Sequence, residues 1–302
     1  MGANQHTPLV SFVTVNYNNT SDTCELLKSI RSLNYPNIEV IVVDNASNES
    51  PEFRLKEIYP EVKCIVSNKN LGFAGGNNIG IVEAKGEYLF FVNNDTIMTP
   101  NIIESLLEMF EKHHDAGVVS PKFHYYFAPG TIEFAGYKSV NIFNGRNSMI
   151  GCREKDKGQY DKAAITNYGH GAGMMVPARV IKEAGLMPDV YFLYYEEFDW
   201  CEQIKRKGYK IYYQPKALIY HKESMSVGKK SILKTYYLTR NRILFMRRNV
   251  KGLPLWVFTS YFLFITIPKN TITFLFNLEL DHLKAFWRGF TWNLSNPNVK
   301  NI

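Results

Sequence analysis

The sequence of 302 residues has few cysteines, and none is placed to form a disulfide framework or a zinc site. The four cysteines stand far apart and form no CxxC pair: Cys24, Cys64, Cys152 and Cys201. A chain of this length without a disulfide framework is typical of a reducing compartment. The N-terminus also lacks a basic segment followed by an apolar one, so no secretory signal is predicted. We therefore expect a cytoplasmic protein.

Glycine-rich nucleotide-binding motifs are missing as well. A dinucleotide-binding fold needs GxGxxG directly after its first strand, where this sequence has the polar residues 16–19, NYNN. The glycine-rich stretch GFAGGNNIG begins only at Gly72, two predicted strands later, and no Walker loop occurs. A GGxGTRL-like loop, which a sugar-1-phosphate nucleotidyltransferase would need, is also absent. These absences argue against an oxidoreductase, a P-loop NTPase and a nucleotidyltransferase.

Charge is modest, and its basic excess lies in one segment. Apolar residues make up 45% of the chain and charged residues 21%, which is typical of a globular protein. The net charge is +7, yet residues 222–251 alone hold nine basic residues and one acidic residue. A general nucleic-acid binder is usually basic over a whole face, so we expect no nucleic-acid partner. A local anionic partner, either phosphates or an anionic membrane surface, fits this pattern.

Strands and helices alternate in the first 120 residues. Apolar runs rich in β-branched residues predict buried strands over 9–15, 38–43, 62–66 and 87–92. Helices are expected over 20–33, 51–58 and 100–113, and another is expected to follow a loop over 68–78 and end near Ala84. Thr20, Ser21 and Asp22 can cap the first helix, and Pro100 suits the first position of the last. This alternation predicts an α/β fold with a mostly parallel, doubly wound sheet.

The later part of the chain is less regular. Residues 120–195 read as irregular strands and loops, with a helix after Pro177. A helix over 196–207 and short strands over 209–213 and 217–220 are expected next. The chain then becomes basic and helical, and finally very apolar.

Polar residues gather where three of the predicted strands end. These clusters are residues 16–19, 44–47 and 93–95. In parallel α/β sheets, ligands bind at the carboxyl ends of the strands. Asn, Asp and Ser are ordinary turn residues, so one cluster alone would indicate little. Three clusters at the same end of the sheet favour a binding site.

Two groups of side chains could carry chemistry. Asp95 at a strand end suits a hard divalent cation, and His221 could add a nitrogen ligand or be a structural histidine. Glu196, Glu197 and Asp199 follow an aromatic stretch and could include a general base with a raised pKa. Acids at a helix N-terminus also favour the helix dipole, so both interpretations stay open for them.

The ordered set of motifs resembles the family 2 glycosyltransferases, which have the GT-A fold. The matching stretches are VTVNYNN from Val13, VVDNAS from Val42, NKNLGFAGGNN from Asn68, FFVNNDT from Phe90, GHGAGMMV from Gly169, YYEEFDWCEQIKRKGYKI from Tyr194 and LIYH ending at His221. The resemblance covers roughly residues 9–250. The segment YLTRNR from Tyr237 makes the chain most similar to the rhamnosyltransferase-type members.

The resemblance implies a role for each matching residue. Asn16, Tyr17 and Asp44 would hold the base and ribose of a nucleotide sugar. The donor pocket would be shaped by Asn70, Gly72, Phe73, Asn77 and Asn94. Asp95 and His221 would bind Mg²⁺ or Mn²⁺, which bridges the diphosphate. Glu197 would be the general base, with Glu196 and Asp199 supporting the acceptor site.

The resemblance also implies a reaction, with two departures from the family pattern. It implies inverting transfer of a sugar to a glycan or lipid-linked acceptor in surface polysaccharide synthesis, with dTDP-rhamnose the first donor and UDP-sugars the second. The usual DxD motif is Asn93-Asn94-Asp95 here, which leaves one carboxylate for a metal. The alternative is therefore a catalytically inactive subunit that binds a nucleotide sugar or glycan. The QxxRW motif of processive synthases is absent, which favours a single transfer.

We expect a catalytic domain over residues 1–225 and a basic, then apolar, helical region over 226–302. Residues 221–230 combine basic residues, serines and a glycine, and are expected either to close over the diphosphate or to be a plain connector. Residues 253–267 form an uncharged run of fifteen, short of the ~20 residues that a spanning helix needs. Residues 280–294 mix aromatic and charged residues like an interfacial helix.

These features predict helices that lie in, or dip into, one leaflet on the inner face of the cell membrane. The basic segment before them would meet anionic headgroups. The alternative is that the apolar C-terminal region packs on the catalytic core or forms the interface of a homo-oligomer.

Overall fold

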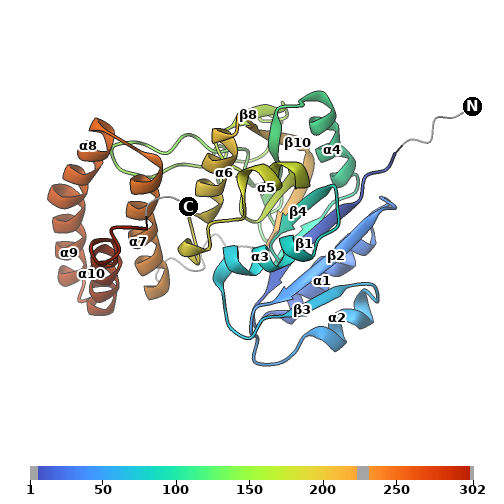
Figure 1. The fold of residues 1–302 in the computed structure, drawn as a ribbon, viewed down its shortest axis with the longest axis horizontal. Helices are drawn as coiled ribbons and strands as arrows, with labels where there is room; N and C mark the ends of the chain where they lie inside the picture. Colours follow the sequence, from blue (N-terminus) through green and yellow to red (C-terminus); the bar gives the residue numbers. More distant parts are fainter. Residues whose placement is uncertain (1–5, 223–230, 300–302) are drawn as a thin grey trace, which may run out of the picture. The chain divides into compact units, whose positions relative to one another are not determined.

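The computed structural model describes residues 6–222 and 231–299, which fall into two compact units (Figure 1). The first unit contains Met1–Lys138, Met149–Phe192 and Glu196–Met225. The second contains Ser139–Ser148, Leu193–Tyr195 and Ser226–Ile302. The region 223–230, in which most of the expected lid and the expected domain boundary fall, lies outside the described residues.

Four parallel strands form one half of the sheet in the first unit. In chain order they are β1 (Val10–Asn16), β2 (Ile38–Asp44), β3 (Lys63–Val66) and β4 (Tyr88–Val92). Their order in the sheet is β3-β2-β1-β4, and the β1–β2 register pairs Asn16 with Asp44. Because β1, β2 and β3 end level with one another, the polar residues that follow them lie at one edge of the sheet. The four predicted strands are confirmed.

The other half of the sheet is mixed. It contains β5 (Thr96–Met98), β6 (Ala116–Tyr125), β7 (Ile132–Phe134), β8 (Ala164–Thr166), β9 (Gly173–Pro177) and β10 (Lys210–His221). The strand β9 runs antiparallel to β4 and β6, whereas β10 runs parallel to β6. The α/β fold class is confirmed, with a sheet of ten strands flanked by helices.

Two predictions about these strands were wrong. From residue 120 on, irregular strands and loops were expected, but β6 is a regular strand through Tyr125. All ten of its residues are buried, including the polar Ser120, Lys122 and His124, which interrupt the apolar pattern. The two short strands expected over 209–213 and 217–220 are one strand, β10, whose register against β6 shifts between Gln214 and Leu218. Pro215 lies at this shift, because proline cannot donate a ladder hydrogen bond.

Helices cover the sheet, and some begin at other residues than predicted. They are α1 (Thr20–Arg31), α2 (Glu52–Ile58), α3 (Gly72–Glu83), α4 (Ile102–Lys112), α5 (Ala178–Ala184), a 3-10 turn η1 (Asp189–Tyr191) and α6 (Glu196–Arg206). Asn19 precedes α1 as its N-cap, so Thr20 is helical and does not cap it. Asn101 is the N-cap of α4, so Pro100 lies outside that helix.

The glycine-rich stretch from Gly72 is helical, not a loop. A Cβ atom at Gly80 would lie 2.3 Å from Cγ1 of Val13 in β1, and one at Gly72 would lie 2.1 Å from the carbonyl oxygen of Phe192. Gly72 also has φ of +72°, which only glycine adopts readily. These glycines therefore allow α3 to lie against β1 and against the segment after η1.

The second unit is helical. It contains α7 (Ile232–Asn249), α8 (Leu253–Tyr261), a π-helical turn η2 (Phe262–Thr266), α9 (Ile267–Phe276) and α10 (Leu280–Ser295), and α10 packs along α7 (Figure 1). A Cβ atom at Gly289 would lie 2.7 Å from the carbonyl oxygen of Tyr236, so this glycine permits the close approach. Among the described residues, no helix combines the length and hydropathy needed to cross a bilayer.

Several arginines of the basic segment are used inside the second unit. Arg240, Arg242 and Arg248 are buried. Arg247 donates hydrogen bonds to the carbonyl oxygens of Asn293, Asn296 and Pro297 at the C-terminal end of α10. The expectation that the whole basic segment meets anionic headgroups is therefore wrong for the three buried side chains.

Candidate active site

Asp44 is held by amide and hydroxyl groups at the ends of β1 and β2. Nδ2 of Asn16 lies 3.0 Å from Oδ1 of Asp44, and Oγ of Ser47 donates to the same oxygen at 2.5 Å. Oδ1 of Asn16 accepts a hydrogen bond from Oγ1 of Thr23 at 2.8 Å. Asn16 and Asp44 are both buried, whereas Tyr17 beside them is 50% exposed. The edge thus presents a fixed carboxylate next to an aromatic ring that a base could stack on.

The predicted donor residues on the next loop shape the backbone. Oδ1 of Asn70 accepts hydrogen bonds from the N–H of Gly72 at 2.8 Å and from Nδ2 of Asn45 at 3.0 Å. Nδ2 of Asn77 donates to the carbonyl oxygen of Phe73 at 2.9 Å inside α3. These side chains hold the start of α3 in place, and Asn77 is 1% exposed.

Asn45 is a residue that the sequence analysis did not assign. Its Nδ2 also donates to the carbonyl oxygen of Gly72 at 3.0 Å, and its Oδ1 accepts from the N–H of Leu71 at 2.9 Å. Its hydrogen bonds therefore connect the loop after β2 to the loop before α3. The signal for it was its place directly after Asp44, in one of the three polar clusters.

Asn94 ties the end of β4 to α1. Its Nδ2 donates to Oγ1 of Thr23 at 3.0 Å and to the carbonyl oxygen of Asn19 at 3.3 Å. Since Thr23 also holds Asn16, the ends of β1 and β4 share one hydrogen-bond network. The structure thus gives Asn94 a supporting contact at the site, in the middle of the diminished DxD motif.

The structure brings Asp95 and His221 together, although 126 positions separate them in the chain. Nε2 of His221 lies 3.2 Å from Oδ1 of Asp95, and Nδ1 lies 2.8 Å from Oε1 of Glu133 in β7. Burial opposes the positive charge of His221, but hydrogen bonds to both carboxylates raise its pKa to about 10. Burial likewise opposes the charge of Asp95, but its contact with His221 lowers the pKa of this carboxyl.

This pair fits a divalent cation that completes its shell with phosphate and water. Because Nδ1 of His221 faces the Glu133 carboxylate, Nε2 is the nitrogen that can face a metal, beside the Asp95 oxygen. The described residues contain no group of three or more His, Cys, Asp or Glu side chains placed to hold a metal. One carboxylate and one imidazole with substrate phosphates is a set that Mg²⁺ or Mn²⁺ accepts, and it is too open for a structural site.

Burial distinguishes the three acids at the start of α6. Glu196 and Asp199 are buried, at 3% and 0% exposure, whereas Glu197 is partly exposed. The Glu197 carboxylate lies beside Gly171, where an added Cβ would be 3.9 Å from Oε1. Of the three, Glu197 is therefore the acid that an acceptor hydroxyl could reach.

A chain of contacts joins Glu197 to the Asp95–His221 pair. Gly171 follows His170 in the loop before β9, and Nδ1 of His170 accepts a hydrogen bond from the N–H of Ala172 at 3.1 Å. Nε2 of His170 lies 3.7 Å from Oε1 of Glu133, which in turn contacts His221. The candidate base and the candidate metal ligands thus belong to one cluster in the first unit.

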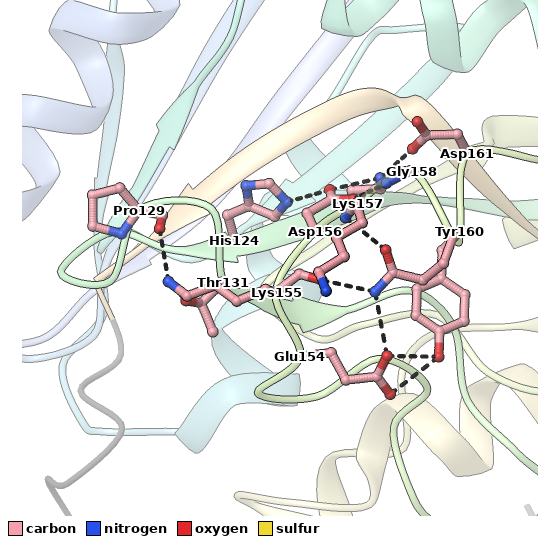
Figure 2. A network of polar contacts seen from close by, with 12 residues as sticks. His124, Pro129, Thr131, Glu154, Lys155, Asp156, Lys157, Gly158, Tyr160 and Asp161 are labelled. Atoms are coloured by element: carbon pink, nitrogen blue, oxygen red, sulfur yellow. Dashed lines mark hydrogen bonds and ion pairs between the residues drawn. The ribbon is translucent and has the colours of Figure 1, made fainter.

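A separate polar network, shown in Figure 2, lies around the loop over residues 154–161. Nζ of Lys122 lies 2.9 Å from Oδ2 of Asp156 and 2.5 Å from Oδ1 of Asp161. Nε2 of His124 lies 2.8 Å from the same Asp156 oxygen. Lys122 and His124 are two apart on β6 and share one face, whereas Phe123 between them packs against His170 on the other face.

The family model described as glycosyl transferase family 2 matches residues 11–177, which is more than half of the chain. This chain belongs to glycosyl transferase family 2. The matched part of this family member includes Asp44 and Asp95 and ends before Glu197 and His221, which join the site through the contacts described above.

Two similar proteins match most of the chain. A dTDP-rhamnosyl transferase of Shigella flexneri, RfbF, is 24% identical over 294 residues, 87% of this chain and 92% of its own length. An uncharacterized glycosyltransferase of Rickettsia typhi is 25% identical over 226 residues, 72% of this chain. The chain spans 65% of the length of that Rickettsia relative.

Solved structures share the fold. The mannosyltransferase PcManGT from Pyrobaculum calidifontis, solved in complex with GDP-Man and Mn²⁺, superposes with a TM-score of 0.60 at 14% identity. The match covers 97% of this chain and 76% of PcManGT. The GT-A fold expected for this family member is confirmed.

Proposed function

We propose that the chain is an inverting glycosyltransferase that moves a sugar from a nucleoside-diphosphate sugar to a hydroxyl of a glycan or lipid-linked glycan in surface polysaccharide synthesis. One observation carries the proposal: the partly exposed Glu197 and the Asp95–His221 pair belong to one cluster at the carboxyl end of the sheet. Family membership supports the class of reaction.

Each part of the site has a task in this reaction. Asp44, fixed by Asn16 and Ser47, accepts a hydrogen bond from the nucleotide base of the donor. The ring of Tyr17 stacks on that nucleotide base. A Mg²⁺ or Mn²⁺ ion held by Asp95 and His221 would stabilise the charge that develops on the departing diphosphate. Glu197 takes the proton from the acceptor hydroxyl as that oxygen attacks the anomeric carbon. A single displacement from the face opposite the leaving group inverts the anomeric configuration.

For the donor we favour dTDP-rhamnose, with UDP-sugars second. The support is the likeness to the Shigella RfbF protein, which covers most of both chains. A carboxylate such as Asp44 can accept the N3–H of thymine or uracil, so the base contact admits both nucleotides. A thermal-shift panel of nucleotide sugars with Mn²⁺ tests this choice, because a ligand that binds the native state raises the melting temperature. A response to a UDP-sugar and none to dTDP-rhamnose would reverse the order.

The replacement of the first DxD acid by Asn93 favours a second candidate, a catalytically inactive subunit that binds a nucleotide sugar or glycan. Such a protein would respond in the thermal-shift panel but release no nucleoside diphosphate. Turnover of donor by the wild-type chain, lost in a Glu197→Gln variant, excludes it.

We further propose that residues 1–225 carry the chemistry and that the helices within 226–302 attach the protein to the cytoplasmic face of the cell membrane. Large apolar side chains on these helices support this: Trp256 is 72% exposed, Phe264 75% and Phe276 88%. Aromatic side chains of this kind favour the interface of a bilayer. A lipid-linked acceptor would then be met where it resides. The alternative use of the same side chains is the interface of a homo-oligomer.

A further inference from the structure

We infer that Glu133 is a positioning residue of the metal site: it holds His221 so that Nε2, and not Nδ1, faces Asp95 and the bound cation. This inference rests on the proposed function, because it concerns the cation that Asp95 and His221 would hold. Neither the sequence motifs nor the family match marks Glu133 as functional, although it lies within the matched residues.

The position of Glu133 is fixed by its strand. It lies in the middle of β7, which pairs with β6, and it has 0% exposure. Both of its carboxylate oxygens approach Nδ1 of His221, at 2.8 and 3.0 Å. Among the described residues, its ion-pair partners are His221 and, at 3.7 Å, His170. A buried carboxylate is costly unless such partners compensate it, so its contact with two imidazoles is the reason it can stay there.

The hydrogen-bond partners decide which nitrogen of each histidine carries a proton. The N–H of Ala172 donates to Nδ1 of His170, so the proton of a neutral His170 is on Nε2, which is directed toward Glu133. An ionised carboxylate only accepts, so Nδ1 of His221 donates to Glu133. A cation at this site would take the place of the proton on the remaining nitrogen, so Nε2 of His221 is the nitrogen that would bind it beside Asp95.

The carboxylate does more than orient the ring. A metal-ligating histidine that donates its other N–H to a carboxylate is a better electron-pair donor, and removal of such a partner typically costs tenfold to a hundredfold in metal affinity. With one carboxylate ligand instead of the two of a DxD motif, this site depends strongly on the second ligand. Asn93 stands where the family pattern has an acid, so the negative charge of that acid is missing beside the cation. The Glu133 carboxylate, in contact with His221, compensates part of this loss.

The chain contains a matched control. Asp156 also accepts a hydrogen bond from a histidine, His124, at 2.8 Å, and it also contacts a strand of the same sheet (Figure 2). His124 and the Lys122 that shares Asp156 lie on the face of β6 opposite Phe123, which packs against His221 and His170. An Asp156→Asn change therefore removes a carboxylate–histidine pair without touching the proposed metal site.

The experiment measures the affinity of the full chain for Mn²⁺, alone and with dTDP, from the electron paramagnetic resonance signal of free Mn²⁺. Glu133→Gln keeps the shape but loses the charge, and Glu133→Asp keeps the charge but withdraws it from His221. We expect both variants to bind Mn²⁺ about tenfold to a hundredfold more weakly, and Asp156→Asn to bind like the wild type. Two substitutions are used so that a folded variant is available even if one fails to fold, which circular dichroism establishes first.

The outcomes separate the inference from the proposed function. If a folded Glu133 variant binds Mn²⁺ like the wild type while His221→Ala does not, Glu133 only packs in the sheet and the inference is wrong. If Asp156→Asn weakens binding as much as the Glu133 variants, the effect is general destabilisation, which also overturns it. If the wild type and His221→Ala bind Mn²⁺ equally, the metal site itself is wrong, and the inference falls with it.

Discussion

At the scale of single residues, exposure and contacts separate side chains that look alike in the sequence. Glu196, Glu197 and Asp199 are three acids within four positions, yet only Glu197 is partly exposed and lies beside the Gly171 loop. His221 looked like a lone histidine at a strand end, and it lies between two carboxylates. Chemistry at this site therefore depends on neighbours that are distant in the chain.

The first prediction at this scale concerns the base. Glu197→Gln removes the proton acceptor and keeps the shape, so we expect transfer to fall by roughly 10²–10⁴-fold while donor binding persists. Steady-state rates and the thermal shift with donor check the two parts. Glu202→Gln is the control, because Glu202 lies on the same helix and contacts Tyr168 and Lys205 instead. Near-normal transfer by Glu197→Gln would assign the base to Glu196 or Asp199.

The second prediction concerns the metal ligands. Asp95→Ala removes the single carboxylate of the motif, so we expect it to abolish metal-dependent binding of the nucleoside diphosphate, and His221→Ala to weaken it. Isothermal titration of dTDP with and without Mn²⁺ measures both. Full activity of the wild type in excess EDTA would contradict the assignment, and phosphate neutralisation would then pass to basic residues after His221.

At the scale of elements, the apolar strands and the ends of those strands were predictable from the sequence. The runs over 9–15 and 38–43 are buried on both faces, so their continuous apolar sequences predicted strands. The polar residues that follow these runs predicted a binding site. The strand β6 was missed because its buried Lys122 and His124 are paired with acids in the loop over 154–161, which the pattern of one strand cannot reveal. Glu133 was missed for the same reason, since its two histidines come from other strands and loops.

The network between β6 and the loop over 154–161 gives a prediction about acid stability. Burial raises the pKa of Asp156, but hydrogen bonds from Lys122, Gly158 and His124 outweigh it and lower the pKa to about 2. Since the pKa is lower in the folded than in the unfolded state, this group stabilises the fold above pH ~4, and the stabilisation is lost as pH falls toward 2.

We therefore expect Asp156→Asn to lower the free energy of unfolding by about 2 kcal/mol near pH 6. The difference from the wild type should shrink as the pH falls from 4 to 2. Denaturant unfolding at several pH values measures it. A difference that stays constant across this range would mean that the Asp156 charge does not stabilise the loop.

At the scale of the whole molecule, the family and the fold follow from residues 11–177 and the sheet, whereas the helices α7 to α10 of the second unit lie outside the matched residues. The sequence predicted its helices, and the uncharged run over 253–267 favoured helices in one leaflet over a single straight span, which stays a prediction. It could not predict that Arg240, Arg242 and Arg248 are buried, because the sequence of a basic segment does not tell which of its side chains face the protein interior.

Membrane attachment gives a prediction for the second unit. Replacing Trp256, Phe264 and Phe276 together by Ser removes exposed apolar area, so we expect the variant to lose sedimentation with anionic lipid vesicles. The exposed Phe53 and Val82 of the first unit, changed to Ser, serve as a control that leaves binding intact. If the wild type ignores vesicles and the triple variant instead dissociates an oligomer, the apolar surface is an interface between subunits.

The central claim is that this chain transfers a sugar by direct displacement with Glu197 as base. The most direct measurement follows dTDP-rhamnose and a panel of UDP-sugars by proton NMR with Mn²⁺, with water as the acceptor in place of the unidentified glycan. We predict release of the nucleoside diphosphate from one donor, with the first-formed free sugar inverted at its anomeric carbon, and loss of this release in Glu197→Gln. Retained configuration in the first-formed sugar, or binding of a donor with no release by the wild type, would contradict it.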